Sequence, residues 1–517
     1  MIAAANLLAN NYIYRCLRAR ALRAYAKGEP VQTVCELIED SAHFTFRNHI
    51  GMFCDGRLEN IAYRIGQDLE ERGAEQLFDG LPRSCPDGAT LHVVSNVFLA
   101  GGHSRMLAKW INRDHLGPAA LVFTRPQQDL PGFFRAILAE RNVPVFLLGN
   151  YPNWSDRALA LRAIAATSRR VILHTHPDDV IPVLAFAGNA KQVPIAIFNH
   201  AHYWFCLGST IASLYINTRE YFRNMSERYR YARASYVLRN AGSELDIYSA
   251  GPVDKLSAKR ALGYPDGQTI LLTMGSAFYY APAGQYDFFR TAQVILQQHD
   301  AARLVFVGIS GDETFIPASM RNHPRVDFLG CIENPARHFL AADIFLESFP
   351  RPSLGATVQA AALGEAFPVV AYGVGENVNQ IDRSDLFPGS RRAINESDYL
   401  RMLGELIVKP DETRKLARLI RMHLIEIDAG YEAGLAELYR TIDLCHVASG
   451  RIPAGRMLIN LDTMALASQS ERPGLRLGVL VDLLATTCKS LATRYGQKLR
   501  RQYDRHIRWR MQRNIDK

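Results

Sequence analysis

ADIFLESFPRPSLGATVQAAALGEAFPVVAYG, residues 342–373, is the stretch that decides the fold of this chain. A short apolar strand ends at Glu347, a loop with two prolines follows, a helix of small residues begins near Leu354, and FPVVAYG is again an apolar strand. Strand, helix and strand in this order indicate two parallel strands joined by a crossover helix. The loop carries Arg351 and Ser353, which a purely structural crossover would not need, so we predict a binding role for it.

Upstream of this stretch, short apolar runs alternate with helical patterns in two successive series. The first series comprises LHVVSN, AALVFT, VPVFLLG, RRVILHTH, VPIAIFNH and ASYVLRN, and the second begins with QTILLTMG, ARLVFVG and RVDFLG. Strands that alternate with helices are typical of a parallel sheet covered on both faces. We therefore predict an α/β protein with two facing Rossmann-like domains and helical additions at both ends.

The same patterns set the expected domain boundaries. Residues 1–88 form a helical region without a catalytic pattern, which favours a cap or an oligomerisation element. Residues 89–250 and 251–440 form the two Rossmann-like domains, and residues 441–517 form a helical, basic C-terminal region.

Composition and charge exclude several classes of protein. The chain has 517 residues, 48% of them hydrophobic and 21% charged, and its formal net charge is +9. Nine Lys or Arg against two Asp between Arg494 and Lys517 give that tail a net charge of +7, so the rest is close to neutral, which argues against a broad nucleic-acid-binding surface. Eight scattered cysteines and no apolar run long enough for a membrane span favour a reducing cytoplasm.

The first predicted turn of the first domain is Gly101-Gly102-His103-Ser104-Arg105. Two glycines let the backbone approach a ligand closely, and the N-terminus of the following helix favours an anion. Arg105 adds a charge for a phosphate or an acceptor group.

Two later strands of the first domain end in histidines. His174 and His176 precede Asp178 and Asp179, and they suit either acid/base chemistry or a polar strand end with an Asp cap. His200 and His202 follow the next strand beside Tyr203, Trp204 and Phe205. These aromatic rings suit either a sugar-binding floor or core packing around a satisfied histidine.

The predicted strand-to-helix turns of the second domain lie where a nucleoside diphosphate would meet a Rossmann-like sheet. They include Ser276 and Tyr279 after the first strand and Gly308 after the second. The backbone amides of residues 355–357, at the start of the helix after Ser353, complete the expected anion site.

The segment 342–373 and the GG turn together resemble bacterial glycosyltransferases of the GT-B fold, over roughly residues 90–440. The similarity is to the broad glycogen-synthase-like group and, more loosely, to the group of O-GlcNAc transferases and bacterial protein glucosyltransferases. The resemblance implies a UDP- or GDP-sugar as co-substrate, held mainly by the second domain, with no bound metal or other cofactor. It implies a surface-glycan, lipid-linked or protein acceptor, held mainly by the first domain.

The resemblance assigns three sets of residues. The donor set is Ser276, Tyr279, Gly308, Arg351, Ser353, Gly355, Ala356, Thr357 and Gln359. The phosphate or acceptor loop is Gly101, Gly102, His103 and Arg105, and the catalytic base of an inverting enzyme is His202, His176 or His200; a retaining enzyme needs no side-chain base.

Three departures from this family leave a second interpretation open. Gln359 replaces a common glutamate, Tyr279 and Tyr280 lie where a phosphate-binding Lys or Arg is frequent, and His200 and His202 lie where an Asp is common. An enzyme with an altered donor site and a catalytically silent GT-B-fold binding protein both fit these residues.

The C-terminal segment 475–513 begins apolar and ends rich in arginine. It suits an interfacial helix on anionic lipid at the inner face of the plasma membrane, which would make the protein peripheral, or a helix packed on the protein itself. A scaffold acting through this tail on a membrane or a nucleic acid is the remaining alternative, with nucleic acid the weaker partner. The oligomeric state is left open.

Overall fold

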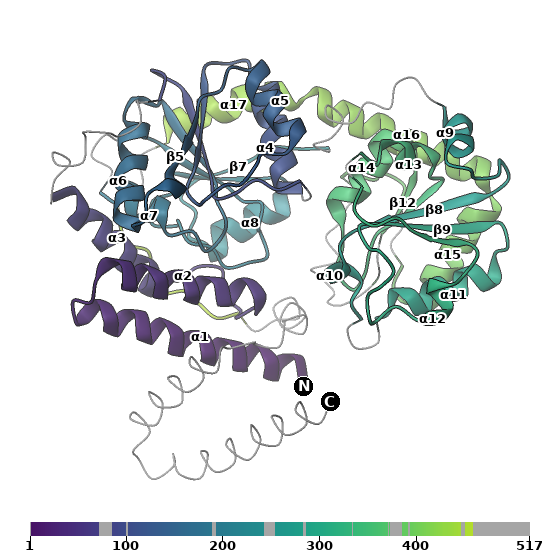
Figure 1. The fold of residues 1–517 in the computed structure, drawn as a ribbon, viewed down its shortest axis with the longest axis horizontal. Helices are drawn as coiled ribbons and strands as arrows, with labels where there is room; N and C mark the ends of the chain where they lie inside the picture. Colours follow the sequence, from purple (N-terminus) through teal and green to yellow (C-terminus); the bar gives the residue numbers. More distant parts are fainter. Residues whose placement is uncertain are drawn as a thin grey trace, which may run out of the picture.

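The computed structural model describes residues 2–71, 85–99, 102–188, 193–241, 254–282, 286–332, 334–370, 372, 385–390, 393–445 and 450–458. Gly101, the linker expected near residue 251 and the basic segment 475–513 lie outside these residues. Two α/β domains lie side by side, and three N-terminal helices pack below the first (Figure 1). The predicted fold class is therefore confirmed.

The first domain is built on a seven-stranded sheet in the order β3-β2-β1-β4-β5-β6-β7, with every pairing parallel. The central strands are buried on both faces, as expected of a sheet covered by helices. Strand β6 (Leu214–Asn217) was not predicted from the sequence. The strands are β1 Thr90–Val94, β2 Ala119–Phe123, β3 Val145–Leu147, β4 Arg170–His174, β5 Ile195–Phe198, β6 Leu214–Asn217 and β7 Ser235–Val237, and the helices are α4 Gly102–Arg113, α5 Gly132–Glu140, α6 Trp154–Ile164, α7 Ile181–Phe186 and α8 Glu220–Tyr229.

The second domain has a five-stranded parallel sheet in the order β10-β9-β8-β11-β12. Its first and fourth strands in sequence pair in the centre, which brings the loops after β8 and β11 next to each other. The strands are β8 Thr269–Met274, β9 Ala302–Val307, β10 Val326–Phe328, β11 Ile344–Leu346 and β12 Phe367–Val369. The helices are α9 Lys255–Ala261, α10 Ala277–Tyr280, α11 Phe288–Gln298, α12 Ala318–Arg321, α13 Ala336–Ala341, α14 Leu354–Gly364 and α15 Glu396–Val408.

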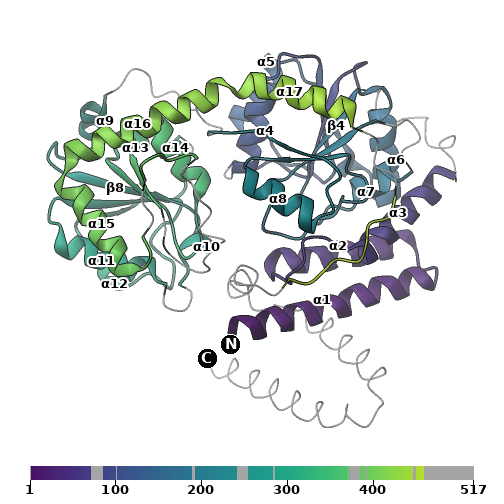
Figure 2. The same ribbon diagram turned by 180° about the vertical axis from the view of Figure 1, so that it is seen from behind.

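The two domains face each other. In both views α10 and α14 lie on the side of the second domain turned towards the first, and α4 and α8 lie on the side of the first turned towards the second (Figures 1 and 2). This arrangement brings the loops around α10 and α14 to the side of the second domain that faces the first.

Two consecutive helices, α16 (Pro410–Ala429) and α17 (Tyr431–Leu444), run from the second domain back to the first (Figure 2). α16 packs on the second domain, whereas α17 buries Leu435, Leu438 and Ile442 in a cluster with Trp110 of the first domain. At the junction, buried Lys109 of α4 pairs with Asp428 of α16. The expected boundary at residue 440 therefore falls inside a helix that belongs to the packing of the first domain.

The N-terminal region is helical as expected, with α1 at Ile2–Ala26, α2 at Val31–Arg47 and α3 at Gly56–Glu71. Residues 450–458, expected to be helical, have no helix and instead run along this region. The Gly56 amide donates to the Pro453 carbonyl (3.1 Å), and the Leu458 amide donates to the Gly51 carbonyl (2.8 Å). The described part of the C-terminal region thus joins the N-terminal helices to one another and to the first domain.

The contact between α3 and α7 depends on a glycine, which gives a test of how the N-terminal helices dock. A Cβ atom on Gly66 would lie 2.4 Å from the Leu184 carbonyl oxygen, so Gly66→Ala should push the helices apart. We expect a loss of about 1–3 kcal/mol in the free energy of unfolding, measured by denaturant titration. Gly117→Ala, whose Cβ meets nothing within 4 Å, is the control. Equal stability of the two variants would contradict this docking.

Candidate active site

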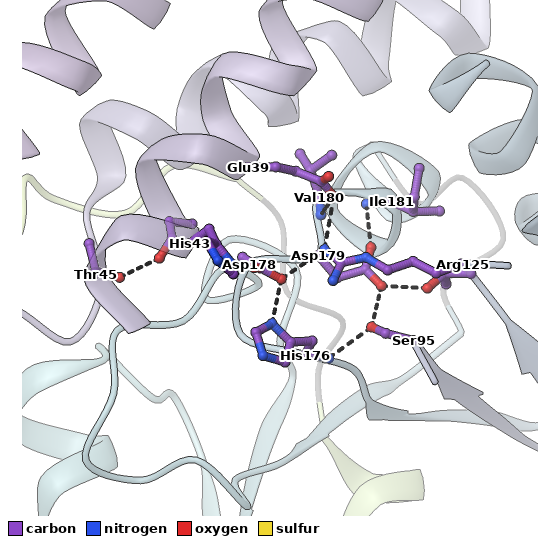
Figure 3. A network of polar contacts seen from close by, with 12 residues as sticks. Glu39, His43, Thr45, Ser95, Arg125, His176, Asp178, Asp179, Val180 and Ile181 are labelled. Atoms are coloured by element: carbon purple, nitrogen blue, oxygen red, sulfur yellow. Dashed lines mark hydrogen bonds and ion pairs between the residues drawn. The ribbon is translucent and has the colours of Figure 1, made fainter. Parts of the chain in front are cut away.

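Polar side chains from three strands meet at the carboxyl edge of the first sheet (Figure 3). Ser95 follows β1, Thr124 follows β2, and Asp179 lies in the loop after β4. The Ser95 hydroxyl donates to the Asp179 carboxylate (2.5 Å), the Thr124 hydroxyl donates to the same oxygen, and the Ile181 amide donates to the other (3.0 Å). Asp179 is thus fully engaged in holding the loop between β4 and α7.

The neighbouring carboxylate, Asp178, contacts two imidazole rings and one guanidinium group. Nδ1 of His176 lies 2.5 Å from one oxygen, Nδ1 of His43 lies 2.8 Å from the other, and the Arg125 guanidinium donates at 2.7 Å. Burial acts to raise the pKa of Asp178, but the hydrogen bonds from His176 and His43 and the charge of Arg125 outweigh it and hold that pKa well below its usual range. Asp178 is therefore an ionised carboxylate that orients His176.

Helix α2 contributes to this site although its sequence carries no catalytic pattern. Glu39 lies 3.3 Å from the Arg125 guanidinium and accepts the Val180 amide at 3.2 Å, and His43 reaches Asp178 one helical turn further on. Burial and the nearby charge of Asp179, opposed by Arg125, raise the pKa of Glu39 to about 7. The i, i+4 spacing of residues 39 and 43 puts them on one face, but nothing local indicates what that face contacts.

A group of half-buried aromatic rings borders His176. The Phe46 ring centroid lies 4.7 Å from that of His176 and 5.4 Å from that of Trp204. Trp204 belongs to the aromatic segment noted in the sequence, whereas Phe46 comes from α2 and was not anticipated. Tyr203 instead packs edge-on to Phe222. The neighbouring rings of Tyr203 and Trp204 therefore have different packing partners and do not form one continuous floor.

His200 and His202 lie in settings unlike that of His176. The His202 ring stacks on Phe222 at 3.5 Å, its Nδ1 lies 3.2 Å from the Asn199 carbonyl, and burial lowers its pKa to about 3. The His200 ring packs on His103 at 4.3 Å, and burial holds its pKa well below the usual range. These contacts are those of packed, neutral histidines, and only His176 among the three has a carboxylate partner.

The GG turn leads into α4 at Gly102, which is exposed. Nε2 of His103 lies 2.7 Å from the His174 carbonyl, and burial lowers the pKa of His103 to about 4. Arg105 is buried, with its guanidinium 4.9 Å from the Phe133 ring centroid. The side chains of His103 and Arg105 are thus engaged within the first domain, and an acceptor or phosphate role for this loop stays a prediction.

Behind the turn, a pair of histidines is fully buried in the sheet. Nδ1 of His92 on β1 lies 3.0 Å from Nε2 of His174 on β4, and Trp110 packs edge-on to both rings. Burial lowers the pKa of His92 to about 3 and that of His174 well below its usual range. His174, which the sequence grouped with His176, is therefore a core residue.

In the second domain, the loops after β8 and β9 touch through two glycines. Gly308 has a left-handed backbone (φ +100°), and a Cβ there would lie 2.6 Å from the Gly275 carbonyl oxygen. Ser276 precedes α10, and its carbonyl accepts the amide of Tyr279, whose side chain is half-buried. The predicted donor residues Ser276, Tyr279 and Gly308 are thus adjacent at the carboxyl edge of this sheet.

Arg351 fastens the loop after β11 to this edge. Its guanidinium donates to the carbonyls of Phe278 (2.8 Å) and Ala281 (3.3 Å) and lies 4.3 Å from the Phe278 ring centroid. In this structure Arg351 therefore joins the α10 and α14 loops, and a phosphate contact for it stays a prediction.

The start of α14 is the open part of the donor set. Ser353 precedes the helix without a side-chain cap, and its carbonyl accepts both the amide and the hydroxyl of Thr357 (3.1 Å each). Thr357 and Gln359 are buried and Ala356 is half-buried, whereas Gly355 is exposed and a Cβ there would meet nothing within 4 Å. Unpaired amides at the N-terminus of a helix favour an anion, and a phosphate contact at this helix start stays a prediction.

Other features of the described residues lie away from these edges. A surface hollow of about 480 Å³ lies between α11 and α15, lined in part by His299, Glu396 and Arg401. None of its lining residues comes from the loops after β8, β9 or β11. Across the described ranges no cluster of three or more His, Cys, Asp and Glu side chains is arranged to hold a metal ion. None of the helices in the described part of the chain has the length and apolar character needed to span a bilayer.

Comparison with known proteins identifies the fold. No protein-family model matches the chain, and no curated protein sequence matches it. Among solved structures, HepE of Anabaena in complex with UDP and glucose is similar with a TM-score of 0.51 and 15% identity, over 68% of this chain and 100% of HepE. A glycosyltransferase from Rickettsia africae is similar with a TM-score of 0.52 and 12% identity, over 69% of this chain and 98% of its own.

An O-GlcNAc transferase of Thermobaculum terrenum has a TM-score of 0.49 and 11% identity over 84% of each chain. At such identities a structural likeness shows the fold, and the fold shared with HepE and the Rickettsia protein is that of GT-B glycosyltransferases. The chain therefore has the GT-B fold that its sequence predicted.

The buried histidines predict a loss of stability in acid. The pKa values of His92, His103, His174, His200 and His202 are lowered by burial, while unfolded histidines take up a proton near pH 6.5. The unfolded state thus binds more protons as the pH falls below 6.5, and stability is lost in that direction. Three groups contribute in the opposite direction and are fewer: Glu39 and Glu59, whose pKa values burial raises to about 7, and His43, whose pKa is raised by its hydrogen bond to Asp178.

We expect the melting temperature to fall between pH 7 and pH 5, and His92→Gln to make that fall shallower. Gln retains a partner for His174 and cannot titrate. His115→Gln, at an exposed position, is the matched control and should follow the wild-type slope. A wild-type melting temperature that is flat or rises towards pH 5 would contradict this account.

Proposed function

We propose that this protein is a nucleotide-sugar-dependent glycosyltransferase. The observation that carries the proposal is half-buried His176 paired with buried Asp178 at the carboxyl edge of the first sheet, on a fold whose second sheet has the exposed start of α14 at its own carboxyl edge. In open α/β sheets, ligands bind at the carboxyl ends of the strands. The donor is a UDP- or GDP-sugar, and the acceptor is a surface glycan, a lipid-linked sugar or a protein.

The donor site combines the loops after β8, β9 and β11. Gly275 and Gly308 bring two backbone turns together, and the amides at the start of α14 face the diphosphate near Gly355. Helix amides and the helix dipole neutralise part of the diphosphate charge, so the proposed reaction needs no bound metal for that purpose. Arg351, anchored on Phe278, holds these loops in one arrangement and presents a cation to the same site.

His176 is the proposed general base, and the reaction inverts the anomeric carbon. Nδ1–H donates to the ionised Asp178, which leaves Nε2 as the nitrogen that accepts a proton. Nε2 takes the proton of the acceptor hydroxyl as its oxygen bonds to the anomeric carbon and the nucleoside diphosphate leaves from the opposite face. His202 and His200 are poorer candidates for this role because each ring packs against another ring, and their Nδ1 atoms lie against backbone carbonyls rather than a carboxylate.

A single substitution tests the donor site without disturbing the fold. Gly355→Asp places a carboxylate where the diphosphate should lie, in open space and at a helix start where an anion stabilises the helix. We expect UDP or GDP and one family of their sugars to raise the melting temperature of the wild type. The variant should lose this shift while its own melting temperature is unchanged or higher.

Gly355→Asn is the isosteric neutral control and should retain most of the nucleotide shift. Titration with UDP, GDP, dTDP, CMP, UDP-glucose, UDP-GlcNAc and GDP-mannose then identifies the donor. If no nucleotide shifts the wild type, the protein is the catalytically silent GT-B-fold binder that Gln359 and Tyr279 leave open. Equal shifts in the Asp and Asn variants would place the diphosphate elsewhere.

His176→Ala tests the base. The variant should bind the donor as the wild type does, because the contacts of His176 lie in the first domain. Turnover should fall by roughly two to four orders of magnitude. Turnover is measured as the release of nucleoside diphosphate in the presence of a pool of oligosaccharide acceptors. Asp178→Asn should fall in the same direction, since it removes the charge that orients the imidazole.

His115→Ala, at an exposed position in the loop before β2 and so at the opposite edge of the first sheet, is the control for loss of a histidine. A turnover in His176→Ala that matches this control would exclude His176 as the base. In that case a retaining reaction without a side-chain base is the remaining mechanism for this fold.

A second role rests on sequence alone. The basic segment 475–513 supports peripheral association with an anionic membrane from the cytoplasmic side, which would suit a lipid-linked acceptor. Deletion of the segment should abolish sedimentation with anionic vesicles and leave the nucleotide-induced shift intact. Retained sedimentation would exclude the segment as the membrane anchor.

A further inference from the structure

Two aromatic rings from different parts of the chain meet beside the proposed base. Phe46 of α2 and Trp204 of the loop after β5 are both half-buried, so part of each ring is exposed to solvent. We infer that these two rings, here called the aromatic platform, bind a pyranose ring of the acceptor, so that the acceptor is a carbohydrate. This inference rests on the proposed function, and it selects a sugar, whether of a surface glycan or of a lipid-linked acceptor, over a protein.

The geometry of the platform suits a sugar ring next to His176. The Phe46 and Trp204 centroids are 5.4 Å apart with their planes tilted by 51°, and the His176 ring lies 4.7 Å from Phe46. Ring faces inclined to each other in this way form a shallow angle rather than a flat wall. The C–H faces of a pyranose pack against such rings while its hydroxyl edge stays available for hydrogen bonds.

Two further polar side chains bind the same carboxylate as His176. The side chain of His43 is 51% exposed and that of Arg125 is 26% exposed, and both are held by the buried carboxylate of Asp178 (Figure 3). His43 offers Nε2 and Arg125 offers guanidinium N–H groups to an incoming hydroxyl. A sugar bound on the platform therefore finds both an apolar face and hydrogen-bonding groups within one small area.

The same polar side chains argue against an acyl chain or an extended peptide as the group bound at this place. An acyl chain would need continuous apolar lining, whereas the rings here are interrupted by two imidazoles and a guanidinium. A peptide in extended form is usually bound by pairing with an edge strand, but the site lies over the central strands β1 and β4 of the sheet. Alternating apolar and hydrogen-bonding surface on this scale fits a carbohydrate best.

The platform is held in place before a ligand arrives. The fully buried guanidinium of Arg230 donates to the carbonyls of Ala201 (3.0 Å), His202 (3.0 Å) and Trp204 (2.8 Å). Nε2 of His49, three residues beyond Phe46, lies 3.1 Å from the Tyr203 carbonyl and so ties the end of α2 to the same loop. Such preorganisation lowers the entropic cost of ordering the binding surface.

The experiment measures binding of the full chain to immobilised oligosaccharides, followed by saturation-transfer NMR with those that bind. Phe46→Ala and Trp204→Ala should weaken binding roughly tenfold, as loss of one ring contact would. Phe46→Tyr keeps a ring and should bind as the wild type does. Tyr12→Ala, which removes a ring 52% exposed on α1, is the control for loss of an aromatic side chain and should also bind as the wild type.

The thermal shift induced by UDP or GDP is measured in the wild type and in every variant. This measurement separates the proposal of a transferase from the proposal that the aromatic platform binds a sugar. If the nucleotide shift is intact in the wild type but no oligosaccharide binds, the carbohydrate acceptor is wrong while the donor site stands. If oligosaccharides bind equally to Phe46→Ala and to the wild type, the platform is not the site. If oligosaccharides bind through the platform but no nucleotide shifts the protein, the platform stands and the transferase proposal fails.

Discussion

Parallel strands bring all their carboxyl ends to one edge of a sheet, and the rest of this structure depends on that constraint. Each edge collects loops that are far apart in sequence, and each loop delivers a few polar groups to the same small area. In the first domain these groups surround the carboxylates of Asp178 and Asp179. In the second they are backbone amides around Gly275, Gly308 and Gly355. The difference suits a base in one domain and a diphosphate in the other.

The buried charge of Asp178 explains why the site draws on a third element. An ionised carboxylate that is only 3% exposed needs several partners to offset the loss of water. The loop after β2 supplies Arg125 and the loop after β4 supplies His176, but the remaining partner, His43, comes from α2. Helix α2 of the N-terminal region is thus part of the site.

The docking of those helices in turn depends on close backbone contacts. Gly56 and Gly66 allow residues 450–458 and helix α7 to approach the N-terminal helices more closely than any side chain would permit. Helix α17 packs on the first domain after α16 has packed on the second, so the C-terminal region crosses both domains and then returns to the N-terminal helices. The shape of the proposed acceptor site is therefore coupled to the packing of both chain ends.

The sequence by itself determined the two α/β domains and their strand-to-helix loops. It also determined the placement of His176 and Gly308 after strands and of Gly355 at a helix start. These features follow from the alternation of apolar strand-like runs with helical patterns along the chain. The spacing of apolar residues and the turn residues indicate this alternation directly. Only the tertiary structure decided that His202 is packed and that Arg351 is bound to its neighbouring loop. It also decided that His43 reaches across 135 residues to Asp178. The physical reason is that a periodic pattern specifies which face of a helix is buried, but not what that face will meet.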